Sequence, residues 1–87
     1  MNRAQQDALQ RLEQQARQLQ ERARVPMGPS KERGFEEDHR DLERRAASAG
    51  STVDWMRALE PGTFWEVEKS TKEELKEIAR GLTRIGL

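Results

Sequence analysis

Glu36 and His39 have the residue types and the spacing of a metal-binding pair. They stand three positions apart, so a helix would place the carboxylate and the imidazole on one face. Two such pairs in a dimer, with further glutamates, would supply ligands for two iron ions. The acidic residues here have a simpler explanation, because negative side chains in the first turn of a helix interact favourably with its dipole. We therefore interpret His39 as a surface histidine near a carboxylate, and predict no metal site, no cofactor and no catalytic residue.

No nucleophile accompanies His39. The serines at positions 30, 48, 51 and 70 are explained as caps, turns or small packing residues, and the chain contains no cysteine. This composition excludes a thiol nucleophile, a disulfide framework and a zinc finger. The absence of cysteine fits a reducing compartment, and no apolar run reaches membrane-spanning length. The sequence therefore predicts a cytoplasmic protein that is not an enzyme and does not bind membranes.

Basic residues that could contact phosphates are matched by acidic ones. The chain carries 16 Lys and Arg against 16 Asp and Glu, whereas nucleic-acid binders are usually basic. Four cations recur every four residues near the C-terminus: Lys72, Lys76, Arg80 and Arg84. Glutamates stand between them, so this ridge is interpreted as a solvated face. Nucleic acid is therefore not the favoured partner.

Residues 42–59 nevertheless resemble a helix-turn-helix motif. Ala46 is followed four positions later by Gly50, and Ser51 can cap a second helix. The resemblance implies that the second helix enters the major groove of DNA. Arg57 is the one basic residue that this helix offers, so two packed helices joined by a glycine turn are the favoured interpretation. A dimeric DNA-binding transcriptional regulator is the alternative function.

The aromatic residues are the best candidates for contacts with a partner. Three of the four lie within residues 52–69, namely Trp55, Phe64 and Trp65. Aromatic side chains bury the largest area per residue, so the core must also draw on them. We predict that Trp55 is buried between helices. Trp65, Phe64 and Arg57 are predicted to form the partner surface, since tryptophan and arginine are enriched in interface hot spots.

Residues 2–24 are predicted to form one helix, because they contain no glycine, proline or β-branched residue. Their apolar residues recur at spacings of three and four, as in a short coiled-coil seam: Leu9, Leu12, Ala16 and Leu19. A helix this polar is marginal alone and must bury its apolar stripe. Either the helix packs on its own domain, or the stripe joins two copies of the chain. We predict a homo-oligomer in which these four residues form the dimer contact.

Two prolines and two glycines mark residues 26–34 as a hinge loop. The loop divides a helical arm, residues 1–25, from a small helical body, residues 35–87. The body is predicted to contain a helix over 35–49 that begins after Gly34 and ends at Gly50, a short helix from Ser51 or Thr52 to Leu59, a strand-like segment over 63–68, and a last helix over 71–85 capped by Ser70. Residues 63–68 mix β-branched and aromatic types, and a helical turn started by Thr63 is the alternative.

The predicted fold class is mostly α: a long N-terminal amphipathic helix, a Pro/Gly hinge, two short helices, an aromatic turn or single strand, and a capped C-terminal helix. The chain has 87 residues, of which 33% are hydrophobic and 37% charged, so it buries little surface alone. We predict a non-enzymatic protein-binding module, acting as an adaptor, regulator or inhibitor of a larger protein. Small phage- and plasmid-encoded proteins that block host factors are similar in size and in their lack of chemical sites.

Overall fold

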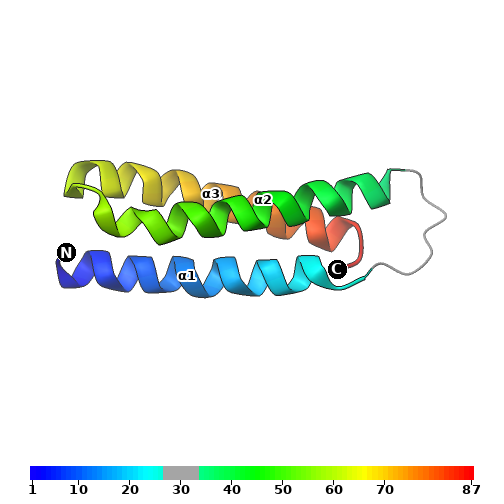
Figure 1. Cartoon of the computed structure of the whole chain (residues 1–87), viewed down its shortest axis with the longest axis horizontal. Helices are drawn as coiled ribbons and strands as arrows, with labels where there is room; N and C mark the ends of the chain where they lie inside the picture. The colour runs from blue at the N-terminus through cyan, green and yellow to red at the C-terminus, as the bar shows by residue number, and fades with distance from the viewer. Residues whose placement is uncertain (27–33) are drawn as a thin grey trace.

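The computed structural model describes residues 1–26 and 34–87, and within these ranges the chain forms a bundle of three α-helices without a strand. Helix α1 spans Arg3–Arg24, α2 spans Phe35–Trp55 and α3 spans Pro61–Arg84, with a short 3-10 helix, η1, at Met56–Ala58. Helices α1 and α3 run in the same direction and α2 runs in the opposite one (Figure 1). The hairpin that joins α2 to α3 therefore lies at the same end of the bundle as the N-terminus. The mostly α class predicted from the sequence is confirmed.

Helix α1 follows its predicted bounds closely, because its first turn is capped from both sides. The Asn2 side chain accepts a hydrogen bond from the Gln5 amide, and the Gln5 side chain accepts one from the Asn2 amide, both at 2.9 Å. The buried residues of the helix recur at spacings of three and four: Gln5, Leu9, Leu12, Ala16, Leu19 and Ala23. This stripe packs against both α2 and α3.

The apolar stripe predicted to join two copies is thus covered inside one chain. Residues 1–25 and 35–87, predicted as an arm and a body, share one hydrophobic core. A dimer through Leu9, Leu12, Ala16 and Leu19 would require the bundle to open, so we do not propose this stripe as an interface. The predicted hinge over 26–34 falls mostly on residues 27–33, which lie outside the described residues.

Helix α2 continues through Gly50, where the sequence predicted its end. Ser51 and Thr52 do not cap a new helix: each hydroxyl donates to the carbonyl oxygen four residues earlier, at 3.2 Å. Gly50 weakens a helix by about 1 kcal/mol relative to alanine, and the burial of Ala49 and Val53 on either side outweighs that cost. The turn that a helix-turn-helix over 42–59 requires is therefore absent, because residues 42–55 belong to a single helix.

Helix α3 includes the segment that was predicted to be a strand. It begins at Pro61, which is well suited to a first helical position, and the Phe64 amide already donates to the Glu60 carbonyl at 2.7 Å. Its buried residues keep the helical period from end to end: Phe64, Glu68, Thr71, Leu75, Ile78 and Leu82. Ser70 therefore lies inside the helix and caps nothing. The β-propensity of residues 63–68 is overridden by the packing of one continuous helical face.

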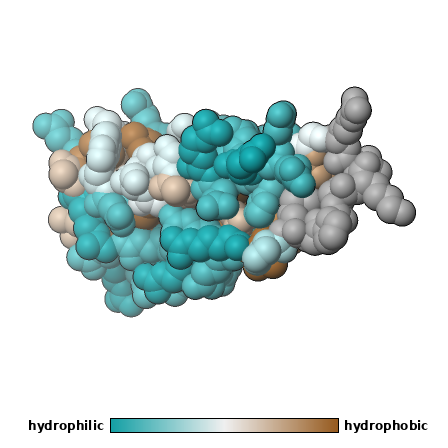
Figure 2. Space-filling view, turned by 45° about the vertical axis from the view of Figure 1, so that its right-hand side comes forward, coloured by the Kyte–Doolittle hydropathy of each residue, from teal (hydrophilic) through white to brown (hydrophobic). Residues whose placement is uncertain are grey.

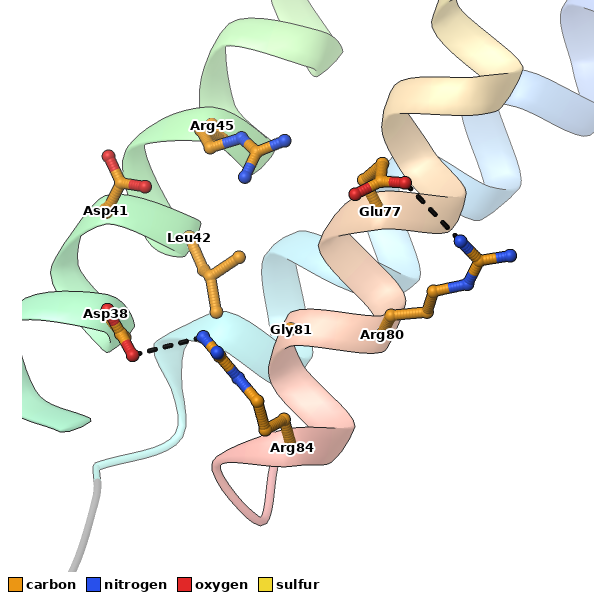
Figure 3. Close-up of a pocket in the computed structure, with 8 residues that line it drawn as sticks. All are labelled: Asp38, Asp41, Leu42, Arg45, Glu77, Arg80, Gly81 and Arg84. Carbon is orange, nitrogen blue, oxygen red and sulfur yellow. Dashed lines mark hydrogen bonds and ion pairs between the residues drawn. The ribbon is translucent and has the colours of Figure 1, made fainter. Parts of the chain in front are cut away.

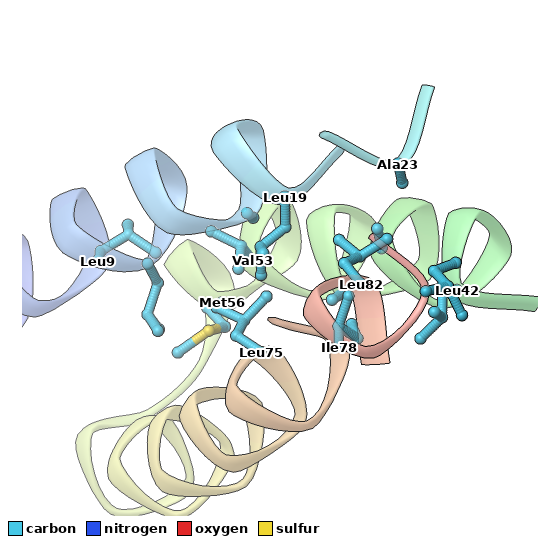
Figure 4. Close-up of a cluster of buried hydrophobic side chains, with 14 of the residues drawn as sticks. Leu9, Leu19, Ala23, Leu42, Val53, Met56, Leu75, Ile78 and Leu82 are labelled. Atoms are coloured by element: carbon cyan, nitrogen blue, oxygen red, sulfur yellow. The ribbon is translucent and has the colours of Figure 1, made fainter. Parts of the chain in front are cut away.

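The core runs along the bundle and draws on every helix (Figure 4). Its largest fully buried side chains are Phe64, Leu12, Met56, Ile78, Leu82 and Val53. Met56 in η1 is buried in the core, whereas the neighbouring Trp55, which the sequence analysis predicted to be buried, is 56% exposed. The prediction of a buried Trp55 is wrong because α2 continues to this residue. Val53 faces the core, and a residue two positions later points about 200° away around the helix.

Candidate functional site

The three residues predicted to form a partner surface lie in different environments. Phe64 is fully buried, which corrects its predicted placement on the surface and makes it a core residue. Arg57 is exposed in η1 and forms an ion pair with Glu13 of α1. Trp65 is 40% exposed. Of the three, Trp65 alone offers a partner a large apolar side chain.

Trp65 is exposed on one side and fixed on the other. Its ring meets the ring of Phe64 edge to face, with centroids 5.1 Å apart and planes at 88°. Edge-to-face pairs of this kind are favourable because the positive edge of one ring meets the negative face of the other. Phe64 is held in the core, so it limits the orientations that the indole can adopt. A side chain ordered in this way loses little entropy when a partner covers it.

The hydrogen bond between Arg22 and Thr83 shows on which side of α3 Trp65 lies. Arg22 of α1 donates from a terminal guanidinium nitrogen to the Thr83 hydroxyl of α3, at 3.3 Å, so these two residues mark the facing sides of the two helices. Trp65 stands eighteen residues before Thr83, which corresponds to five helical turns. Trp65 therefore lies on the side of α3 that faces α1, near the start of both helices.

Trp55 is a second exposed tryptophan, which the sequence analysis placed in the core. The other large hydrophobic residues exposed within the described ranges are Met1 and Val25. In Figure 2 most of the visible face is hydrophilic, and pale and hydrophobic atoms gather at the end where α2 joins α3. The periodicity of α2, once it is taken as one helix, is the signal that predicts an outward Trp55.

A pocket between α2 and α3 is lined almost entirely by charged residues (Figure 3). Its lining comprises Asp38, Asp41, Leu42, Arg45, Glu77, Arg80, Gly81 and Arg84. Arg84 donates to Asp38 at 3.1 Å, and Arg80 donates to Glu77 at 3.4 Å. Three acidic and three basic groups balance, and exposed pairs of this kind contribute about 0–1 kcal/mol each. We interpret this pocket as a seam that holds two helices together.

Arg45 of the same seam extends to α3 and forms an ion pair with Glu74. The hydrogen bond that Arg45 donates to Glu74 raises the pKa of the Arg45 guanidinium, and the negative charges of Glu74, Asp41 and Glu77 add to this effect. Partial burial lowers the same pKa but does not outweigh the hydrogen bond. Arg45 is therefore a permanent cation that joins α2 to α3.

His39 takes part in a helix-to-helix contact. Its Nε2 atom lies within hydrogen-bonding distance of the Ala23 carbonyl oxygen at the end of α1, where carbonyls lack helical partners. Glu36 is exposed. Within residues 1–26 and 34–87 no group of three or more His, Asp and Glu side chains is arranged to hold a metal ion.

Comparisons with protein-family models, with curated proteins and with solved structures give no match for this chain. In the part of the chain that the structure describes, none of the helices has both the length and the apolar character needed to cross a membrane. The functional interpretation therefore depends on the surface of the bundle itself.

Proposed function

We propose that this protein is a non-enzymatic protein-binding module, an adaptor, regulator or inhibitor, that docks its partner over Trp65. The observation that carries the proposal is the setting of this side chain: it is 40% exposed, yet its ring packs edge to face against the buried Phe64. An ordered, half-exposed tryptophan is typical of interface hot spots, which combine large contact area with small entropic cost.

The remaining surface supports this choice. The pocket between α2 and α3 has a balanced charge, and the Arg84–Asp38 and Arg45–Glu74 ion pairs already join the two helices. Trp55 is more exposed than Trp65, but no aromatic contact among the described residues orders its ring. We therefore place the binding surface on the Trp65 side and treat Trp55 as a matched control.

A DNA-binding regulator is not favoured by any feature of the bundle. The second helix of the suspected helix-turn-helix is the end of α2, and no turn separates it from residues 42–49. Its candidate base-reading residue, Arg57, pairs with Glu13. We expect no tight, sequence-specific binding to duplex DNA.

Photo-crosslinking in the native cell tests the proposed surface. A photoreactive residue replaces Lys69, one turn after Trp65, and in a control chain it replaces Ser51, one turn before Trp55. Both positions are exposed, so neither replacement disturbs the core. We expect a specific protein adduct from position 69 and a much weaker one from position 51. Adducts of equal yield at both positions, or at position 51 alone, would contradict the proposal.

A further inference from the structure

We infer that the partner presents an acidic protein segment, which lies along the face between α1 and α3 and places an apolar residue over Trp65. This inference rests on the proposed function and adds the chemistry of the partner. It depends on which residues share the face that Trp65 occupies.

The hydrogen bond between Arg22 and Thr83 defines this face, because it joins α1 to α3 directly. On α1, Arg11 stands eleven residues before Arg22, so its side chain leaves the helix roughly 20° around the axis from that of Arg22. On α3, Lys72 and Lys76 stand eleven and seven residues before Thr83, each again roughly 20° from it.

Lys69 lies roughly 40° from the direction of Thr83, one turn after Trp65. The face, called here the α1/α3 face, therefore carries one tryptophan and five cations: Trp65, Lys69, Lys72, Lys76, Arg11 and Arg22. All of these except the half-buried Arg22 are exposed.

Most of these cations have no ion-pair partner in the part of the chain that the structure describes. Among the described residues, Lys72 pairs with Glu68 at 3.0 Å, whereas Arg11, Lys69 and Lys76 form no ion pair. Arg22 donates from two guanidinium nitrogens to the main-chain oxygen of Leu87, at 3.1 and 2.8 Å, so it is already engaged within the bundle.

The nearest other acidic residues on these two helices point outward from the α1/α3 face. Asp7 lies roughly 60° from the direction of Arg22, and Glu73 roughly 80° from that of Thr83. Four other acidic residues lie on the seam between α2 and α3, away from this face: Asp38, Asp41, Glu74 and Glu77. The α1/α3 face of this chain, whose net charge is zero, thus carries more cations than anions, and a docking partner responds to this local charge.

An acidic protein segment fits this face better than a nucleic acid does. From Lys69 to the level of Thr83 and Arg22, the cations extend over fourteen residues of helix, about 21 Å, and an aromatic ring stands at one end only. Proteins that bind single strands place aromatic platforms along the whole path, and duplex binding relies on a net positive charge that this chain lacks. A helix that lies along the α1/α3 face would instead present carboxylates to Lys69, Lys72 and Lys76 at matching spacing.

Binding of designed peptides tests the inference. The probe is a 21-residue amphipathic helical peptide with glutamates at i, i+3 and i+7 and a leucine one turn earlier. Two further peptides replace the glutamates with glutamine or with lysine, and a 20-nucleotide single-stranded DNA is the fourth probe. Binding to the whole protein is measured by calorimetry at 50 and 200 mM salt.

We expect the glutamate peptide to bind at least about tenfold more tightly than the glutamine peptide and to weaken at higher salt. The lysine peptide should bind least. The double variant Lys69→Gln/Lys76→Gln should lose about tenfold in affinity for the glutamate peptide. The control Arg17→Gln/Arg24→Gln removes two cations from the α1/α2 side and should change affinity less than about twofold.

Three results would overturn the inference. Equal binding of the glutamate and glutamine peptides, lost in Trp65→Ala, would leave the proposed function intact and show that the partner is not acidic. Tighter binding of the DNA would identify a nucleic acid as the ligand of this face. Binding of no peptide below about 1 mM, with crosslinking at position 69 preserved, would show that the surface is correct and the stated chemistry wrong.

Discussion

Gly81 of α3 lies directly against the Leu42 side chain of α2, and replacing it with alanine tests the packing of the bundle. A Cβ atom at position 81 would lie 2.7 Å from Cδ2 and 3.0 Å from Cδ1 of Leu42. Leu42 is 4% exposed and points toward Gly81 across the seam in Figure 3, so it must shift within the packed seam to make room for a methyl group. Overpacking of this kind costs about 1–3 kcal/mol, whereas alanine gains about 1 kcal/mol of helix propensity. We expect Gly81→Ala to destabilise the protein by about 0–2 kcal/mol.

Two other glycines provide matched controls. A Cβ atom at Gly50 would lie 2.0 Å from the Nε2 atom of Gln20, the end of a flexible side chain that donates to the Ala46 carbonyl. Gly50→Ala therefore exchanges one hydrogen bond of about 1 kcal/mol for a similar gain in helix propensity and should be nearly neutral. A Cβ atom at Gly62 meets no atom within 4 Å, so Gly62→Ala should be neutral or slightly stabilising.

Urea titrations and thermal melts followed by circular dichroism measure these differences. One kcal/mol corresponds to about 4–8 °C in the melting temperature of a domain of this size. Leu42→Val makes room beside position 81 for the added methyl group. The double variant should therefore lose less free energy of unfolding than the sum of the losses in Leu42→Val and Gly81→Ala. The packing would be refuted if Gly81→Ala raised the melting temperature as much as Gly62→Ala, or if the double variant lost the sum of the two single costs.

Three further predictions concern stability. Phe64→Ala should lower the free energy of unfolding by about 3–5 kcal/mol because the ring is fully buried, whereas Trp55→Ala should change it by no more than about 0.5 kcal/mol. Urea titration compares the two variants, and a larger loss in Trp55→Ala than in Phe64→Ala would contradict the burial described. Leu12→Ala should lower the melting temperature equally at 5 and 200 μM protein, because its contacts lie within one chain; a dependence on concentration would indicate a dimer. Because the pKa of Arg45 is raised in the folded protein, its contribution to the free energy of unfolding is complete at all pH values below its unfolded pKa and is lost only above that value. The melting-temperature difference between wild type and Arg45→Gln should therefore be the same at pH 6 and pH 9. A difference that shrinks at pH 9 would contradict this assignment.

Some of the fold can be predicted from sequence because the local signals agree with the packing. The stripe from Leu9 to Ala23 has the helical period, and its residues are helix formers without a breaker. Asn2 and Gln5 cap the start of this helix, and Gly34 lies at the start of α2 as predicted. In these places propensity, periodicity and capping all indicate the same element.

The errors arise where a local signal is opposed by packing that involves distant residues. Gly50 is typical of a helix end, but here it has another role. The space that a side chain at position 50 would fill is occupied by Gln20 of α1, thirty positions earlier in the chain. Ser70 and Thr71 are typical of a helix start. The helix nevertheless begins earlier, because Phe64 and Glu68 extend the buried face of α3 into the preceding turns. No local pattern contains that information.

The candidate site could be predicted only in part for the same reason. The exposure of Trp65 is consistent with its predicted role, and the lysines of α3 are visible in the sequence as a charged ridge. The α1/α3 face also contains Arg11 and Arg22, which join that ridge only when α1 packs beside α3. Trp55 was misplaced because its helix was divided at Gly50.

A calorimetric titration with the partner captured from position 69 tests most directly whether Trp65 forms the binding surface. Wild type is compared with Trp65→Ala and Trp55→Ala, and melting curves confirm that each variant remains folded. We expect Trp65→Ala to weaken binding by about 2 kcal/mol or more, roughly thirtyfold, and Trp55→Ala to change it less than about twofold. An unchanged affinity in Trp65→Ala, or a larger loss in Trp55→Ala, would contradict the proposed surface.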